Sequence, residues 1–180
     1  MPELIPYEPS LRILSLTLNP VEEQVVHRIE STGGRKVITL SPSYFTGAVS
    51  FGARADRMAI ARAEAFFTSL RGQENYFDLP LQNIKPTGGA GGSVVSVGEN
   101  NKIEVNFSTE IGFYWHSKGR LFIHVSREGS MMELLPNIPW AAGDIIQPAS
   151  FIRVRPSGAV NLPITPHWGG GWTLQFEELI

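Results

Sequence analysis

Cysteine is absent from the 180 residues of this chain, which excludes disulfides, thiol catalysis and thiolate-bound metals together. Long apolar runs are also absent: no stretch approaches the roughly 20 residues of a membrane-spanning helix, and the start of the chain lacks a basic segment followed by an apolar one. Neither sign of charge dominates, since 15 basic and 17 acidic residues leave a net charge of −2. We therefore expect a protein of an aqueous compartment, with no membrane partner and no sequence-specific binding of nucleic acid.

Glycine and proline are abundant, with 18 and 13 residues, and this favours short β elements joined by many turns. Hydrophobic residues make up 42% of the chain and charged residues 18%, a balance typical of a folded domain. The sequence predicts a mainly β protein: a single β-sandwich or barrel-like domain over 1–180, with one packed helix and a hairpin or meander extension.

Alternation of apolar and polar residues predicts short strands over the first half of the chain. In the first of them Leu14, Leu16 and Leu18 would share one face, and Asn19-Pro20 would end the strand. Glycines within 31–34 predict a hairpin between the second and third strands, because glycine readily adopts the positive φ of such turns. The expected strands are 11–18, 23–29, 36–40, 45–51 and 76–79.

A single helix is predicted from about Arg57 to Arg71, with Asp56 as its N-cap and Gly72 just beyond its last turn. Its apolar residues recur at helical spacing, which indicates that one side packs against a sheet. The residues of this stripe are Ala59, Ile60, Ala63, Phe66, Phe67 and Leu70.

A glycine-rich segment near 85–93 (KPTGGAGGS) is interpreted as a flexible loop that divides a β and helix half from a carboxyl-terminal β-meander half. Turns at 98–101, 117–119 and 128–129 separate the strands of this meander, and its stretch 93–126 is a candidate arm for binding neighbours. The strands expected in this half are 93–97, 102–107, 113–116, 120–126, 131–134, 145–146, 151–155 and 172–176.

A search for catalytic motifs finds none. No Gly-x-Ser-x-Gly elbow occurs, and the glycines of 88–92 are not followed by the Lys-Ser or Lys-Thr of a phosphate-binding loop. The paired carboxylates at 22–23 and 177–178 are interpreted as solvated faces. We expect no catalytic residue, no cofactor and no enzymatic activity.

Two histidines leave a metal site open as an alternative. His116 and His124 would face each other across the turn at 117–119, and Glu104 or Glu133 would complete the ligands. The simpler interpretation is two ordinary strand histidines.

Aromatic residues suggest binding surfaces. Trp115 and Trp172 fit alternating strand positions, which predicts packing, whereas Trp140 and Trp168 fall in loops and are candidates for an interface. Exposed tryptophans would also suit a carbohydrate-binding β-sandwich module, which remains an alternative function. The complete set of interface candidates is Trp140, Trp168, Met131, Met132 and Tyr114.

The order of these features resembles that of minor tail proteins of long-tailed bacteriophages, specifically the distal tail protein of the tail tip or baseplate. The likeness rests on layout across most of the chain. The segments that carry it are the amino-terminal hairpin, 43–48 (SYFTGA), 66–72 (FFTSLRG), 77–80 (FDLP), 141–146 (AAGDII) and 172–179 (WTLQFEEL).

This resemblance implies a structural role and no catalytic residues. A distal tail protein forms a ring, usually a hexamer, between the tail tube and the tip or hub. The expected partners are therefore further copies of the chain, the tail tube protein and the hub or baseplate proteins. The expected location is the virion tail tip, after assembly in the host cytoplasm. Larger family members carry an added carbohydrate-binding-like domain, for which this chain has no room.

Overall fold

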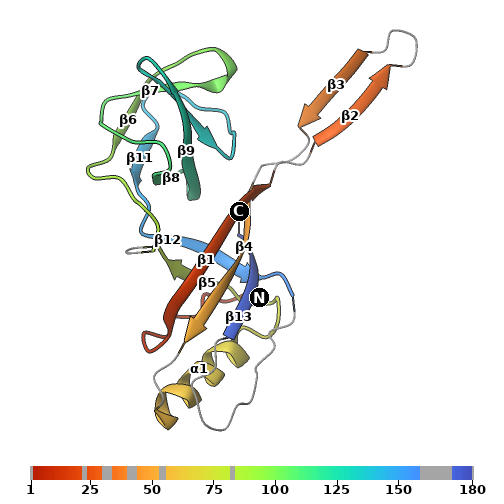
Figure 1. The fold of residues 1–180 in the computed structure, drawn as a ribbon, viewed down its shortest axis with the longest axis vertical. Helices are drawn as coiled ribbons and strands as arrows, with labels where there is room; N and C mark the ends of the chain where they lie inside the picture. Colours follow the sequence, from red (N-terminus) through yellow and green to blue (C-terminus); the bar gives the residue numbers. More distant parts are fainter. Residues whose placement is uncertain are drawn as a thin grey trace.

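The structure, a computed structural model, describes residues 2–21, 24–29, 34–39, 44–52, 56–81, 84–158 and 172–179. It is mainly β with one α-helix, as the sequence predicts. A sheet with its helix forms one end of the molecule, a six-stranded barrel forms the other, and a hairpin projects beside the barrel (Figure 1).

The first body is a five-stranded antiparallel sheet in the order β1-β4-β13-β12-β5. Its strands are β1 (Arg12–Val21), β4 (Tyr44–Gly52), β5 (Phe77–Pro80), β12 (Phe151–Pro156) and β13 (Trp172–Glu178). One face carries the fully buried side chains Phe45, Phe51, Phe77 and Phe176. The strands that form this sheet come from both ends of the chain.

Helix α1 (Arg57–Ser69) begins where the sequence predicts. The Asp56 side chain accepts a hydrogen bond from the Met58 amide at 3.1 Å, which satisfies one of the free donors of the first turn. The helix ends two residues earlier than expected, because Arg71 and Gly72 take positive φ values of 47° and 67°. Phe66 lies edge-on to Phe77 on the sheet, with ring centres 5.2 Å apart. The predicted apolar stripe is therefore the packed face.

Strand β1 departs from the prediction in two places. A register shift between Ile13 and Ser15 turns Leu14 outward, where it is 65% exposed, so the three leucines do not share a face. Pro20 does not end the strand, which continues to Val21 opposite Tyr44. Proline is tolerated here because β1 lies at the edge of the sheet, where an amide donor is not needed on the open side.

The second body is a closed barrel in the order β10-β7-β6-β11-β8-β9. It is not a meander, since β7 pairs with β10 and β11 closes the barrel between β6 and β8. The segment 93–126 therefore belongs to the barrel and is not an arm. The strands are β6 (Gly92–Val97), β7 (Ile103–Val105), β8 (Tyr114–Ser117), β9 (Arg120–Glu128), β10 (Met131–Leu135) and β11 (Ile145–Pro148), with the 3-10 turn η1 (Glu99–Asn101) after β6.

The barrel is an insertion within the sheet, because the chain leaves the sheet after β5 and returns to it at β12. The point where the chain leaves the sheet and the point where it returns lie side by side, because the Leu81 amide donates to the Ser150 carbonyl at 3.0 Å. The predicted carboxyl-terminal half therefore does not form one unit, since β12 and β13 complete the first sheet.

The glycine-rich segment marks the transition into the barrel, but it is not a flexible loop. Gly88 lies so close to the Trp115 ring that a Cβ at this position would collide with it. Gly91 lies equally close to the Ile146 carbonyl, and Gly92 to the Asn106 side chain. The glycines are needed here because the backbone packs directly against its neighbours.

Strands β2 (Gln24–Ile29) and β3 (Gly34–Thr39) form the predicted antiparallel hairpin. They make a two-stranded sheet of their own, and within the described residues they pair only with each other. The hairpin extends from the β1–β4 pair, whose last partners are Val21 and Tyr44. It projects at the barrel end of the molecule, beside the barrel and away from α1 (Figure 1).

Candidate interaction surfaces

Most of the aromatic and methionine residues predicted for an interface are in the core. Trp140 is only 7% exposed, and Tyr114 and Met132 are also buried. Met131 is half-buried on the barrel, where it packs against Gly98. Trp168 lies outside the described residues. The expectation that Trp140 would be exposed because it lies in a loop is wrong.

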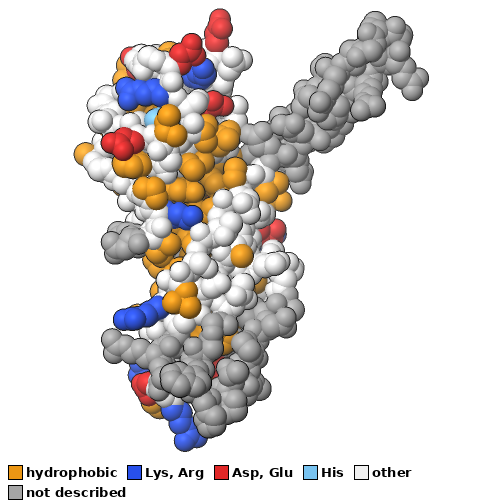
Figure 2. All heavy atoms as spheres, in the orientation of Figure 1, with side chains coloured by type: hydrophobic (Ala, Val, Ile, Leu, Met, Phe, Trp, Pro, Cys, Tyr) orange, Lys and Arg blue, Asp and Glu red, His pale blue; other side chains and the backbone are white. Residues whose placement is uncertain are grey.

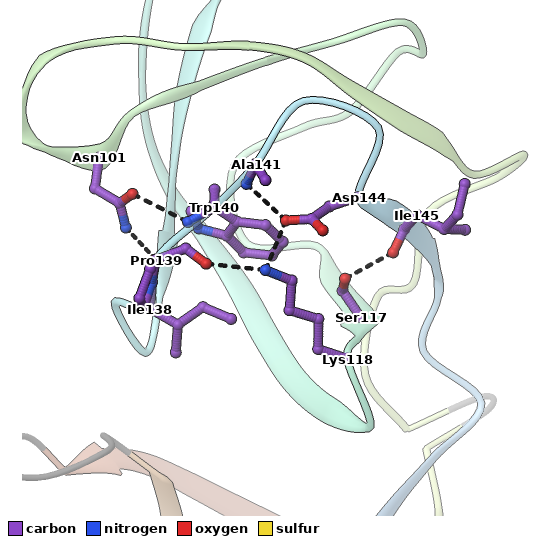
Figure 3. A network of polar contacts seen from close by, with 9 residues as sticks. All are labelled: Asn101, Ser117, Lys118, Ile138, Pro139, Trp140, Ala141, Asp144 and Ile145. Atoms are coloured by element: carbon purple, nitrogen blue, oxygen red, sulfur yellow. Dashed lines mark hydrogen bonds and ion pairs between the residues drawn. The ribbon is translucent and has the colours of Figure 1, made fainter.

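The reason is a polar network that holds the loop 136–144 over one end of the barrel (Figure 3). Lys118, in the tight turn between β8 and β9, forms an ion pair of 2.6 Å with Asp144 and donates to the Pro139 carbonyl at 2.9 Å. Its ammonium group also lies 5.4 Å from the centre of the Trp140 ring. Asp144 in turn accepts from the Ala141 amide at 2.7 Å.

Asn101 holds the same loop from its other side (Figure 3). Its side-chain amide donates to the Ile138 carbonyl, and its oxygen accepts from the Trp140 amide at 3.4 Å. Trp140 can then pack inward against Phe122, with ring centres 4.9 Å apart. This network shapes the barrel end and leaves no tryptophan face there for a sugar.

The tryptophans within the described residues do not support the carbohydrate-binding alternative. Trp115 is fully buried, and its indole nitrogen donates to the Thr109 hydroxyl at 3.0 Å. Trp172 is buried under α1 against Phe67. The predicted packing of both residues is confirmed.

The two histidines are not placed to share a metal. Strand register puts His116 opposite Leu121, while His124 lies further along β9. The His124 ring is buried between the Thr109 hydroxyl, at 3.3 Å, and the Ser126 carbonyl, at 3.0 Å. The described residues contain no cluster of three or more His, Cys, Asp or Glu that could hold a metal ion.

Barrel and sheet are joined by a buried carboxylate that sequence analysis misassigned to a solvated face. Glu178 on β13 is only 6% exposed. It accepts from the Phe45 amide on β4 at 3.0 Å and from the Leu121 amide on β9 at 2.9 Å. Strand alternation offered the signal, because Glu178 has the same parity as the buried Trp172 and Phe176, whereas Glu177 points outward.

At this junction, burial and the neighbouring charges and donors shift the pKa of Glu178 in opposite directions. Burial raises the pKa of Glu178, although the two amide donors and nearby Arg120 favour its charged form. Burial lowers the pKa of Arg120, and its Nε and one terminal nitrogen have no hydrogen-bond partner among the described residues. The two bodies also share apolar contacts, since Tyr114 and Leu121 belong to the core of the sheet. The junction is therefore structural.

The two edges of the sheet differ. At the β5 edge the amino-terminal segment pairs with the residue before the strand, because the Ile5 amide donates to the Tyr76 carbonyl at 2.8 Å. The edge also carries the Asp78–Arg153 ion pair of 2.8 Å. Strand β1 has no second partner among the described strands, and Arg12 is its only charged residue. Long uncharged edges favour pairing with another chain.

The surface around β1 has few charges. Lys, Arg, Asp and Glu side chains gather on the barrel and near α1, and the region between them is mostly hydrophobic or uncharged (Figure 2). A depression of about 310 Å³ in the outer face of the sheet is lined by hydroxyl and amide side chains, including Thr17, Asn19 and Gln175. A second depression, of about 520 Å³, is lined by Arg12 and Arg62 together with Glu8 and Asp56.

No family model matches this sequence, and neither does any curated protein. The described residues contain no helix long and apolar enough to cross a membrane. The functional argument therefore rests on the geometry of the described residues: β1 has one strand partner, and the β2 and β3 strands pair only with each other.

Proposed function

We propose that this protein is a structural component of a bacteriophage tail tip or baseplate, in which copies join head to tail into a ring between the tail tube and the hub. The observation that carries the proposal is the unequal pair of sheet edges. Among the described strands β1 has no second partner and leads into a hairpin whose strands pair only with each other, while the β5 edge is partly covered.

A closed head-to-tail ring needs two different surfaces on each copy, because each copy meets its neighbours through opposite sides. The asymmetry of this chain fits that requirement, since an open and a covered edge cannot form the same contact. A two-stranded hairpin is marginal alone in water and gains stability from a further surface. The sequence resemblance implies six copies, with the tail tube protein above and the hub proteins below.

The proposal places the protein in the virion tail tip after assembly in the host cytoplasm. Its work there would be the matching of surfaces, with no bond made or broken. The tight packing of both bodies supports this role, because preorganised surfaces bind without a large ordering cost.

The test is the assembly state of the full-length chain, measured by light scattering after gel filtration and by negative-stain electron microscopy. We expect closed rings at high protein concentration, alone or after addition of the tail tube protein. Strict monomers under both conditions would contradict the proposal.

The matched variant removes residues 22–43 and joins Val21 to Tyr44 through Asn-Gly. These two residues are cross-strand partners, so a two-residue turn can close the β1–β4 hairpin directly. We expect this variant to be a monomer, and its circular dichroism spectrum should still be that of a folded, mainly β protein.

A further inference from the structure

The depression of about 310 Å³ in the outer face of the sheet forms around a short side chain on its second strand. Strand register places Ala48 on β4 between Thr17 on β1 and Gln175 on β13. Residues directly opposite each other have Cβ atoms about 5 Å apart, so the two longer side chains form walls on either side of the Ala48 methyl group. Thr46, two residues back along β4, and Asn19 opposite it extend the lining.

The floor of this depression is closely packed. A Cβ at Gly47 would collide with the Thr17 carbonyl and with the Phe176 ring, so only glycine fits at this position. Ser157 is held at the rim, because its amide donates to the Gln175 carbonyl at 2.9 Å. All these contacts lie within one hydrogen-bonded sheet. The depression is therefore preformed.

The side chains that line the depression can hydrogen-bond but carry no charge. Hydroxyl and amide groups can each donate and accept hydrogen bonds. The nearest acidic side chain along β13, Glu177, is paired with Arg155 at 2.5 Å, so its charge is already matched. The lining groups are the hydroxyls of Thr17, Thr46 and Ser157 and the side-chain amides of Asn19 and Gln175.

Groups that both donate and accept match a ligand that does the same. A neutral saccharide presents closely spaced hydroxyls of this kind, whereas an ionic ligand would be bound best by an opposite charge, which the lining does not offer. We infer that this depression binds a neutral saccharide, with Thr17, Asn19 and Gln175 bonding its hydroxyls and Ala48 leaving room for the ring. The site contains no tryptophan and goes beyond the structural role proposed above.

The size of the depression sets the expected affinity. Its volume is at the lower end of the range for small-molecule sites, about 300 to 1,000 Å³. Each hydrogen bond exchanged with water contributes only about 1 kcal/mol, so we expect a dissociation constant on the order of 1 mM for one copy of the chain.

The test is an NMR titration of isotope-labelled full-length protein with maltotetraose, cellotetraose and mannotetraose, each up to about 10 mM. We expect at least one of them to shift the side-chain amide resonances of Asn19 and Gln175 in a saturable way. Ala48→Leu fills the depression, and Gln175→Ala removes one wall. Each should weaken this binding by about tenfold or more.

Thr173→Leu is the matched control, because it adds a similar side chain at an exposed position of β13 outside the depression. It should bind as the wild type does. Circular dichroism checks that each variant folds, and if Ala48→Leu does not, the truncation at exposed Gln175 decides.

Three results would overturn the inference. One is the absence of a shift with all three tetrasaccharides, and another is binding that Gln175→Ala leaves unchanged. The third is an equal response to sialyllactose, which carries a negative charge. None of these results depends on assembly, so the saccharide site can fail while the proposed ring stands, and the ring can fail while the site stands.

Discussion

The barrel and the five-stranded sheet differ in whether their strands leave an edge with unpaired backbone groups. The barrel closes on itself, so each of its six strands has two partners, and a loop held by Lys118 covers one end. In the sheet, β1 has one partner among the strands that the structure describes, and the chain continues from it into the β2–β3 hairpin. Closure removes the groups through which strands recruit other chains, whereas an open edge keeps them. In the proposed function, association would therefore involve the sheet edge and not the barrel strands.

The largest expected effect comes from opening the barrel core. Trp140→Ala should lower the free energy of unfolding by about 3 to 5 kcal/mol, because it removes a large buried ring that packs on Phe122. Urea denaturation followed by circular dichroism measures this change. Ile111→Ala, at a side chain that is 63% exposed, is the control. If Trp140→Ala lowered the free energy of unfolding no more than Ile111→Ala does, Trp140 would not be packed in the barrel core.

Glu178→Gln should weaken the junction between the two bodies. At neutral pH we expect a loss of about 2 kcal/mol, because a Gln amide cannot accept from both the Phe45 and Leu121 amides. The control is Glu177→Gln, at the outward-facing neighbour that pairs with Arg155. Equal losses of unfolding free energy in the two variants would show that the buried Glu178 carboxylate does not hold the two bodies together.

The effect of Glu178→Gln on stability should depend on pH. Burial raises the pKa of Glu178 above its ordinary value of 4.5, so the folded chain keeps this proton to higher pH than the unfolded chain. The part of the stability that depends on this proton is full below pH 4.5 and is lost as pH rises through the raised pKa, while the two amide hydrogen bonds to the carboxylate remain. The stability difference between wild type and Glu178→Gln should therefore change across this range, as measured by urea titrations at several pH values. A difference independent of pH would contradict the raised pKa.

A smaller effect is expected at the loop that covers the barrel. Lys118→Met keeps the length of the side chain but removes the ion pair with Asp144 and the bond to Pro139. Because Lys118 is partly exposed, solvent screening limits the loss to about 1 kcal/mol. Hydrogen exchange should show faster exchange of the Trp140 and Ala141 amides. Lys102→Met, which breaks the exposed pair with Glu128, should leave both amides protected.

The smallest effect on stability, and a large one on association, is expected at the open edge. Thr17→Lys places a charge in the middle of β1, where it should change the unfolding free energy by less than about 0.5 kcal/mol yet hinder pairing with another chain. Thr173→Lys makes the same change at an exposed position of β13, which is inside the sheet. Sedimentation velocity compares the two. Equal association would show that the β1 edge is not the contact.

Local features of the fold were predictable from sequence, because their causes lie within a few residues. Asp56 and the spacing of Phe66 and Phe67 define α1, and the glycines of 31–34 indicate the hairpin between β2 and β3. Barrel closure was not predictable, since it depends on β11 pairing with both β6 and β8 across long stretches of chain. Burial of Trp140 was missed for the same reason: its partners Asn101 and Lys118 are distant in sequence.

The points at Leu81 and Ser150 where the chain leaves and re-enters the sheet are adjacent, so the barrel has the geometry of an inserted domain. A foreign module with its own ends close together would keep the strand order of the sheet only if it also replaced the contacts that Glu178 and the sheet core make with Leu121. A label for cryo-electron microscopy inserted at this site would mark every copy of the chain and would therefore test the proposed ring directly.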